Sequence, residues 1–184
     1  MTAVADQAFQ IPSWVWKYKP KRLKRPVDGR VFQVPTQKQA MKNARIILQR
    51  IRKDYAHLTL AEKTPSILEV LRVICPFVYE AVLLTTIDDH GWRIMRSCFT
   101  HDGGIDGTFF LPTGEKFLIQ AKRYRGEIDP EHVIALASVV HREKAQGGVF
   151  IHTGFTCTDS RFVEELAGNI TIIDGEDLVS LVME

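Results

Sequence analysis

The chain has 184 residues, of which 45% are hydrophobic and 25% charged, a balance typical of a globular protein with a sizeable core. Its longest apolar runs, such as Ile67 to Val78, are interrupted by charge or proline and fall short of the roughly 18 residues of a membrane helix, and the N-terminus has no secretory signal pattern. These features exclude a membrane protein and a secreted protein, and they predict a cytoplasmic location.

The cysteines also bound the possibilities. Cys75, Cys98 and Cys157 are odd in number, lie far apart and form no CxxC motif. We therefore expect reduced thiols in the core rather than disulfides or zinc ligands.

Positive charge is concentrated at the N-terminal end of the chain. Residues 1–58 contain 13 Lys and Arg against 3 Asp and Glu, a net charge of +10, whereas the remaining residues contain 11 against 19, a net charge of −8. The run KYKPKRLKR has aromatic residues before and within it, a pattern typical of a segment that follows a phosphate backbone and stacks on bases. We predict a flexible basic arm over residues 1–35 that buries little apolar surface; a solvated tail without DNA contacts is the alternative. The DNA-binding candidates of this arm are Lys17, Lys19, Lys21, Arg22, Lys24 and Arg25.

A helical extension is predicted for residues 36–75. Thr36 and Gln39 have the spacing of a capping box, and apolar residues then recur at steps of three and four, which predicts an amphipathic helix over residues 37–58. Its far side is basic and is a candidate for DNA binding or for a lid, or is simply solvated.

The end of this extension has its own start signals. A second capping box is formed by Thr59 and Glu62. Thr64 and Pro65 follow it, and we interpret them as the cap and first residue of a short helix over residues 66–75.

The next helix is predicted over residues 77–90. Glu80 shares one face of this helix with apolar residues, among them Phe77 and Leu84. A carboxylate there is costly unless it is paired or lies near a metal, so the position favours a functional site. An edge position that reaches water is the alternative.

The stretch from Cys98 to Lys122 combines a glycine-rich acidic turn with two strands. Alternation along residues 117–122 places Gln120 and Lys122 side by side on one face of a strand. The glycines around Asp106 let the backbone bend, which brings its carboxylate close to the Gln and Lys side chains across a hairpin.

An acid, an amide oxygen and an ammonium that converge are suited to metal-assisted hydrolysis of phosphodiesters. Magnesium prefers oxygen ligands and retains water, so Asp106 and the Gln120 oxygen are sufficient protein ligands once a substrate phosphate binds. Lys122 would orient the attacking water and offset negative charge on the phosphate. A surface hairpin with a solvated Asp and Lys is the alternative, because such triplets also arise by chance.

Strands and helices alternate in the rest of the chain. Arg123 and Arg125 follow Lys122 and are further candidates for binding a DNA phosphate; plain surface charges are the alternative. A helix beginning at Asp129 contains His132 and His141, which lack a third ligand at metal spacing and so do not indicate a zinc site. Further strands are predicted at 92–99, 148–152 and 169–173, and further helices at 158–166 and 176–183. Because strand-helix-strand units need crossovers, we predict an α/β fold, a mixed β-sheet with helices on both faces.

Four separated motifs resemble the catalytic domain of Mrr-type restriction endonucleases, a branch of the PD-(D/E)xK nuclease superfamily: HDGGIDG, LIQAKRY, GVFIHTGFT and ITIIDGEDLVSLV. The resemblance covers roughly residues 76–183 and implies a restriction-endonuclease-like fold. The family's metal-binding Asp corresponds to Asp106, and its Gln-x-Lys variant of the usual acidic motif matches Gln120 and Lys122. Its helical Glu corresponds to Glu80, preceded here by Tyr where Phe is usual.

Together these signals predict a magnesium-dependent DNA endonuclease, with manganese as a substitute metal. Asp106 and Gln120 would hold the metal, Lys122 would position the water, and Glu80 would support the metal or a second water. Asp102, in the same turn, is a further partner of the site or simply a turn former.

Two alternatives remain open. One is a nuclease specific for DNA junctions; the other is a DNA-binding or partner-inhibiting protein with little catalysis, because Gln120 removes one negative charge from the site. DNA is the expected partner, a membrane is not, and a homodimer is an open alternative to a monomer. We divide the chain into a basic arm (1–35), a helical extension (36–75) and a nuclease domain (76–184).

Overall fold

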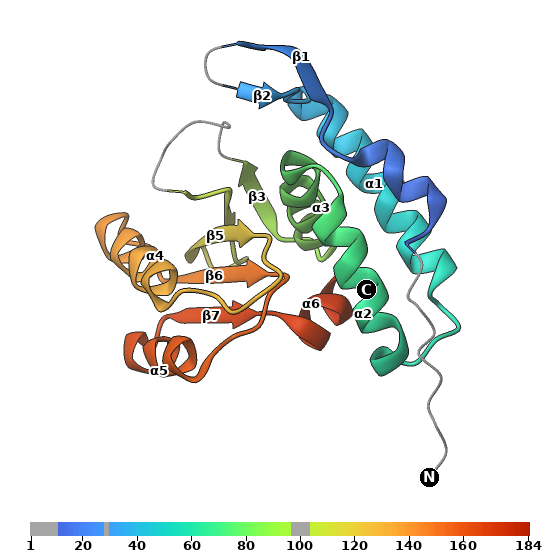
Figure 1. Cartoon of the computed structure of the whole chain (residues 1–184). Helices are drawn as coiled ribbons and strands as arrows, with labels where there is room; N and C mark the ends of the chain where they lie inside the picture. Colours follow the sequence, from blue (N-terminus) through green and yellow to red (C-terminus); the bar gives the residue numbers. More distant parts are fainter. Residues whose placement is uncertain (1–10, 28–29, 97–103) are drawn as a thin grey trace.

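A five-stranded mixed sheet forms the centre of the molecule (Figure 1). The computed structural model describes residues 11–27, 30–96 and 104–184. Strands β3, β4 and β5 are antiparallel, whereas β5, β6 and β7 are parallel, and the strands lie in the order in which they occur in the chain. The predicted mixed α/β architecture is therefore confirmed. The strands are β3 (Arg93–Arg96), β4 (Gly107–Phe110), β5 (Lys116–Lys122), β6 (Gly147–His152) and β7 (Ile170–Ile173).

The alternation predicted for β5 separates two apolar cores. Ile119 belongs to the core on one face of the sheet and Leu118 to the core on the other. The second core is closed by the two helices that connect the parallel strands, since a parallel pair needs a long crossover. These are α4 (Pro130–Arg142), between β5 and β6, and α5 (Thr158–Ala167), between β6 and β7.

The remaining helices cover the opposite face of the sheet (Figure 1). The apolar stripe of α1 is buried at its predicted positions, including Ala44, Ile47 and Ile51. Helix α3 is buried on nearly all sides because it lies between α1 and the sheet, as expected of a helix that is apolar all round. These helices are α1 (Gln37–Asp54), α2 (Leu60–Val73), α3 (Pro76–Asp89) and α6 (Gly175–Met183).

The expectation that the N-terminal arm buries little apolar surface is wrong for residues 13–18. Ser13–Tyr18 forms a 3-10 helix (η1), and its Val15 and Tyr18 are buried in the main core. These residues are three apart, so a helix of three residues per turn places them on one face. The Tyr18 carbonyl also accepts a hydrogen bond from the Cys75 amide (2.7 Å). The segment continues as a two-stranded hairpin, β1 (Arg22–Val27) and β2 (Arg30–Phe32).

The start of the second helix also differs from the prediction. The Thr59 hydroxyl and the Glu62 carboxylate form a complete capping box, and α2 continues from there through Pro65 without a break. Proline removes one backbone hydrogen bond, and the Thr64 hydroxyl donates to the Leu60 carbonyl (2.8 Å) in the turn that precedes it. The capping box therefore outweighs the proline as the start signal. The predicted cap at Asp129 is confirmed, because its carboxylate accepts from the Glu131 amide (2.9 Å).

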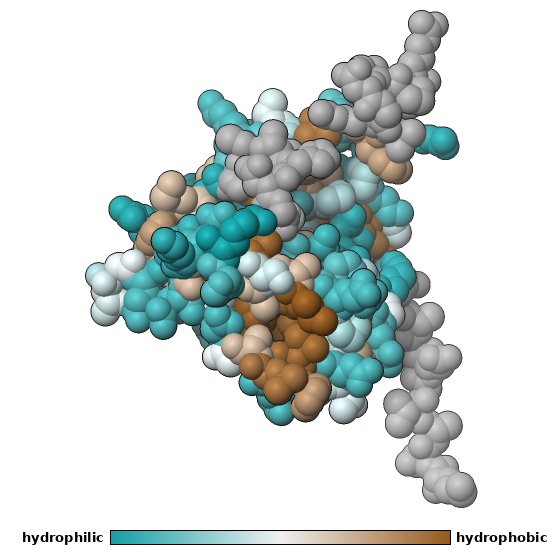
Figure 2. All heavy atoms as spheres, turned by 90° about the vertical axis from the view of Figure 1, so that its left-hand side faces the viewer, coloured by the Kyte–Doolittle hydropathy of each residue, from teal (hydrophilic) through white to brown (hydrophobic). Residues whose placement is uncertain are grey.

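An apolar patch lies on the surface formed by α4 and α5. Figure 2 views this side of the molecule and shows a brown area among hydrophilic surroundings. The exposed large apolar side chains of the two helices are Ile134 on α4 and Phe162 and Leu166 on α5. None of the helices in the described part of the chain is long and apolar enough to cross a membrane.

Candidate active site

Three of the four predicted catalytic residues, Glu80, Asp106 and Lys122, line one cavity where α3, β4 and β5 come together, and Gln120 lies behind Gly104, which also lines it. A cavity of about 290 Å³ is lined by Tyr79 and Glu80 from the start of α3, by Asp106 from the residues before β4, and by Lys122 and Arg123 from the end of β5. The sheet register brings these segments together, since Gly107 of β4 lies opposite Ile119 of β5. Residues separated by more than 40 positions thus share one cavity.

The Asp106 carboxylate is fixed by the backbone of the neighbouring strand. Its Oδ2 accepts a hydrogen bond from the Ala121 amide (2.7 Å), and its own amide donates to the Ile119 carbonyl (2.8 Å). Burial raises the pKa of this carboxyl to about 6, although the Ala121 bond and the Lys122 ammonium both lower it. The charged form is therefore expensive here, and a bound cation would stabilise it.

The pKa of the Glu80 carboxyl is raised further than that of the Asp106 carboxyl. Burial and, to a lesser degree, the negative charge of Asp106 raise the pKa of its carboxyl to about 8, although Arg123 and Lys122 both lower it. Two carboxyl groups thus face one cavity, with two cations that only partly offset them. Glu80 therefore lines this cavity, and its role there stays a prediction.

The side-chain oxygen of Gln120 is buried next to the sheet. Its side chain is 6% exposed, and its Oε1 has no hydrogen-bond partner in the part of the chain that the structure describes. The amide nitrogen lies against Gly104, whose φ of +77° is favourable only for glycine, and a Cβ there would come within 2.5 Å of Gln120 Nε2. Gly104 therefore makes room for this amide.

The donor set fits a hard divalent cation. Within the described ranges, no three His, Cys, Asp or Glu side chains gather into a metal site. What the site offers is two carboxyl groups, from Asp106 and Glu80, and the unpartnered oxygen of Gln120. Oxygen donors of this kind suit magnesium or manganese and are a poor match for zinc.

The two arginines after β5 have different environments. Arg123 lines the cavity, and its Nη1 donates to the carbonyls of Arg72 (2.8 Å) and Ile74 (2.5 Å), which ties β5 to the link between α2 and α3. Burial lowers the pKa of its guanidinium. Arg125 instead forms a two-point ion pair with Glu69 on the surface (2.8 and 2.5 Å).

Two contributors to the site were not predicted. The Tyr79 hydroxyl donates to the Ile151 carbonyl on β6 (3.4 Å), which fixes the turn of α3 that carries Glu80. Arg72 donates to the carbonyls of Tyr124 (3.1 Å) and Thr153 (2.9 Å) beyond the ends of β5 and β6. No local pattern signals these contacts, because their partners lie 52 to 81 positions away in the chain.

The other predicted residues lie away from this cavity or outside the described residues. Asp102 and Cys98 fall outside the described residues. His132 on α4 is engaged with the Tyr124 hydroxyl (3.1 Å). Among the basic candidates, Lys24 and Arg25 lie on β1, Arg22 is exposed at its start, and Lys17, Lys19 and Lys21 line a second cavity.

Comparison with known proteins places this geometry in a family. The Mrr_cat family model, described as a restriction endonuclease, matches residues 71–182. The type IV methyl-directed restriction enzyme EcoKMrr of Escherichia coli (strain K12) is 33% identical over 127 residues, which cover 65% of this chain and 41% of that enzyme. The chain therefore spans less than half the length of this curated relative.

Among solved structures, two restriction endonucleases are similar. The MspJI restriction endonuclease in complex with a 27-mer oligonucleotide aligns with a TM-score of 0.43 at 21% identity, covering 82% of this chain and 34% of that one. The DNA modification-dependent restriction endonuclease AspBHI aligns with a TM-score of 0.40 at 18% identity, covering 84% and 39%. Because the family model matches more than half of its residues, the chain belongs to the Mrr_cat family of restriction endonucleases.

Proposed function

We propose that the chain is a DNA endonuclease that depends on magnesium or manganese. The single observation that carries this proposal is the buried, unpartnered Oε1 of Gln120 beside the Asp106 hairpin. A buried polar atom without a partner costs on the order of 1 to 3 kcal/mol, so its retention favours a ligand that completes it. Membership of a restriction endonuclease family supports DNA as the substrate.

We assign a role to each side chain of the cavity. Asp106 and Gln120 would hold the cation, with Glu80 as a further oxygen ligand or as the acceptor of a proton from water. When bound, the cation would supply Lewis-acid stabilisation of the phosphate and a more acidic water. Lys122 would orient the attacking water and offset the charge that develops on the phosphate oxygens. Arg123 would hold the end of β5 against the link between α2 and α3 through its two hydrogen bonds to carbonyls.

A supercoiled plasmid tests this function directly. We expect nicked and linear products with magnesium or manganese and none with EDTA, measured by gel electrophoresis over time. Tight DNA binding without cleavage under every metal condition would instead support the alternative, a DNA-binding protein that retains the fold. Cleavage restricted to branched DNA would support a junction nuclease.

We also propose that the chain forms a homodimer through the apolar patch of Ile134, Phe162 and Leu166. Charge complementarity supports a second copy as the occupant. Helix α4 has acidic Asp129 and Glu131 at its start and basic His141 and Arg142 in its last turn. Two α4 helices packed antiparallel across a two-fold axis would therefore place acidic ends against basic ends. A dimer would also supply the two sites needed to cut both strands of a duplex.

The oligomeric state is the corresponding prediction. Sedimentation equilibrium should give the dimer mass for the wild type and the monomer mass for Phe162→Lys, because a buried unpaired charge at an interface is strongly unfavourable. Met95→Lys is the matched control, since Met95 is equally exposed on β3 and lies outside the patch. A monomeric wild type, or a dimeric Phe162→Lys, would rule out this interface.

A further inference from the structure

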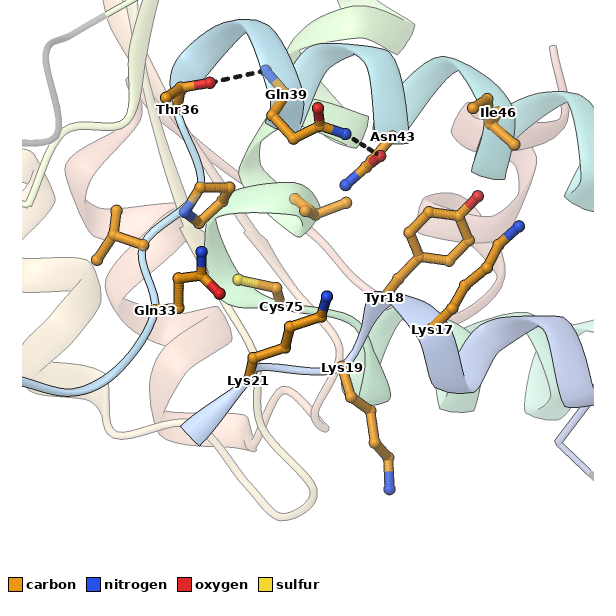
Figure 3. A pocket seen from close by; sticks show the side chains of 13 residues that line it. Lys17, Tyr18, Lys19, Lys21, Gln33, Thr36, Gln39, Asn43, Ile46 and Cys75 are labelled. Carbon is orange, nitrogen blue, oxygen red and sulfur yellow. Dashed lines mark hydrogen bonds between the residues drawn. The ribbon is translucent and has the colours of Figure 1, made fainter. Parts of the chain in front are cut away.

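A second and larger cavity lies beside the N-terminal segment. It has a volume of about 640 Å³, within the range of small-molecule pockets, and it lies between the end of η1, the residues that follow β2 and the first turns of α1 (Figure 3). The catalytic cavity, at about 290 Å³, is less than half as large. The roles assigned above to the catalytic residues make no use of this space.

The lining of this cavity carries positive charge. The described residues that border it include Lys17, Lys19 and Lys21 and no Asp or Glu. In the described part of the chain, none of the three lysines forms an ion pair. Figure 3 shows the Lys21 ammonium turned into the space, whereas that of Lys19 points out of it and lies 3.7 Å from the centre of the Trp16 ring. An anion is the ligand that this charge favours.

The opposite wall offers hydrogen bonds beside apolar surface. The Gln39 amide donates to Asn43 Oδ1 (2.8 Å), which leaves the Asn43 amide nitrogen to donate toward the cavity (Figure 3). Ile46 and Val78 supply apolar surface next to these groups. Charge at one side, amides at the other and an apolar wall between them match a nucleotide, with its phosphate, base edge and base face.

The position of the cavity links it to the catalytic site. Cys75 and Val78 line this cavity, whereas Pro76, Tyr79 and Glu80 line the catalytic cavity, so the start of α3 separates the two. A helix with its side chains is about 10 Å across, and successive nucleotides of one strand rise by about 3.4 Å. A strand cut in the catalytic cavity would therefore reach the larger cavity within a few nucleotides.

We propose that this cavity binds an unpaired nucleotide of the DNA strand that is cleaved, with its phosphate at Lys21 and its base edge at Asn43. The inference rests on the proposed endonuclease function and adds a substrate feature to it. A base within a duplex is stacked on its neighbours and paired along its edge, so its face and its pairing edge are both free to bind only in an unpaired or extruded nucleotide. A free mononucleotide has the same phosphate and base as a nucleotide within a DNA strand. The test must therefore distinguish between these two ligands.

Binding in EDTA tests the proposal without cleavage. Fluorescence anisotropy would compare two labelled duplexes that differ only in one unpaired nucleotide. We expect about tenfold tighter binding of the duplex with the unpaired nucleotide, the low end of what one stacked base contributes. Lys21→Met and Asn43→Leu should each reduce this preference to within twofold. Lys42→Met, an exposed neighbour on α1 outside the cavity, should retain it.

Each other outcome overturns the proposal in a distinct way. Equal affinity of the wild type for both duplexes would contradict the nucleotide site, and so would an unchanged preference in both cavity variants. Neither result bears on the endonuclease function, which plasmid cleavage tests separately. Deoxyadenosine monophosphate, added as competitor, should displace the duplex that carries the unpaired nucleotide. If this mononucleotide bound without being displaced by either duplex, the occupant would be a free nucleotide and the assignment to the cleaved strand would be wrong.

Discussion

Asp106→Asn and Lys122→Ala should each lower the rate of plasmid cleavage by a factor of about 1,000 or more, because each removes a charge placed at the reacting phosphate. Asparagine is the sharper replacement for Asp106, since its oxygen can still accept the hydrogen bond from the Ala121 amide. Alanine would leave that amide unsatisfied and would confuse a loss of catalysis with a loss of stability. The measurement is the initial rate of nicking with magnesium.

Controls separate chemistry from folding and binding. Lys116→Ala changes a lysine at the other end of β5, where it pairs with Glu143, and should cleave at the wild-type rate. Melting temperatures and DNA affinity in EDTA should be similar for Lys122→Ala and the wild type. Cleavage by either active-site variant within tenfold of the wild type would contradict the assigned roles.

Glu80→Gln should make the metal-free protein more stable at alkaline pH while it impairs cleavage. The folded-state pKa of Glu80, about 8, lies above its ordinary value of 4.5, so the folded chain holds this proton more tightly than the unfolded chain. Stability therefore falls as pH rises from about 4.5 to 8, and glutamine removes that loss. Allowing for partial access to water, we expect a gain of about 2 kcal/mol at pH 9, or roughly 4 to 8 °C in melting temperature, and none at pH 4.

Thermal unfolding in EDTA across this pH range checks the prediction. Glu165→Gln, which removes an exposed carboxylate on α5, should give a curve parallel to the wild type. Magnesium should raise the melting temperature of the wild type more at pH 8 than at pH 6, because protons and cation compete for the same oxygens. If the melting temperatures of Glu80→Gln and the wild type changed in parallel at every pH, the pKa of the Glu80 carboxyl would not be raised in the folded chain.

Local signals predicted the parts of the fold that depend on local forces. The alternation along β5 placed Leu118 and Ile119 on opposite faces, and α5 ends at Gly168, which has a φ of +66°, close to the predicted helix end at 166. The grouping of Asp106 with the end of β5 also followed from the sequence, because a hairpin joins neighbouring segments. Spacing and turn chemistry are sufficient for such features.

Contacts between segments that lie far apart in the chain could not be predicted from spacing and turn chemistry. Nothing in the sequence around Tyr18 indicates that its carbonyl accepts from Cys75, or that Val15 belongs to the main core. The carbonyl contacts of Arg123 were equally hidden, because a backbone acceptor exists at every position and its identity depends on packing. The larger cavity has the same origin, because η1, the residues that follow β2 and α1 form it together.

The hydrogen bond from Cys75 to Tyr18 has a consequence for protein engineering. This hydrogen bond joins the basic segment to the residue that precedes α3. The segment proposed to bind DNA is therefore attached directly to the helix that carries Glu80. Chimeras that exchange residues 1–58 with those of a relative would break this joint and expose the pocket that holds Val15. Swapping residues 1–89 in one piece would keep this hydrogen bond but would also replace Glu80 and both carbonyl partners of Arg123, so the N-terminal segment and the nuclease domain should be exchanged together.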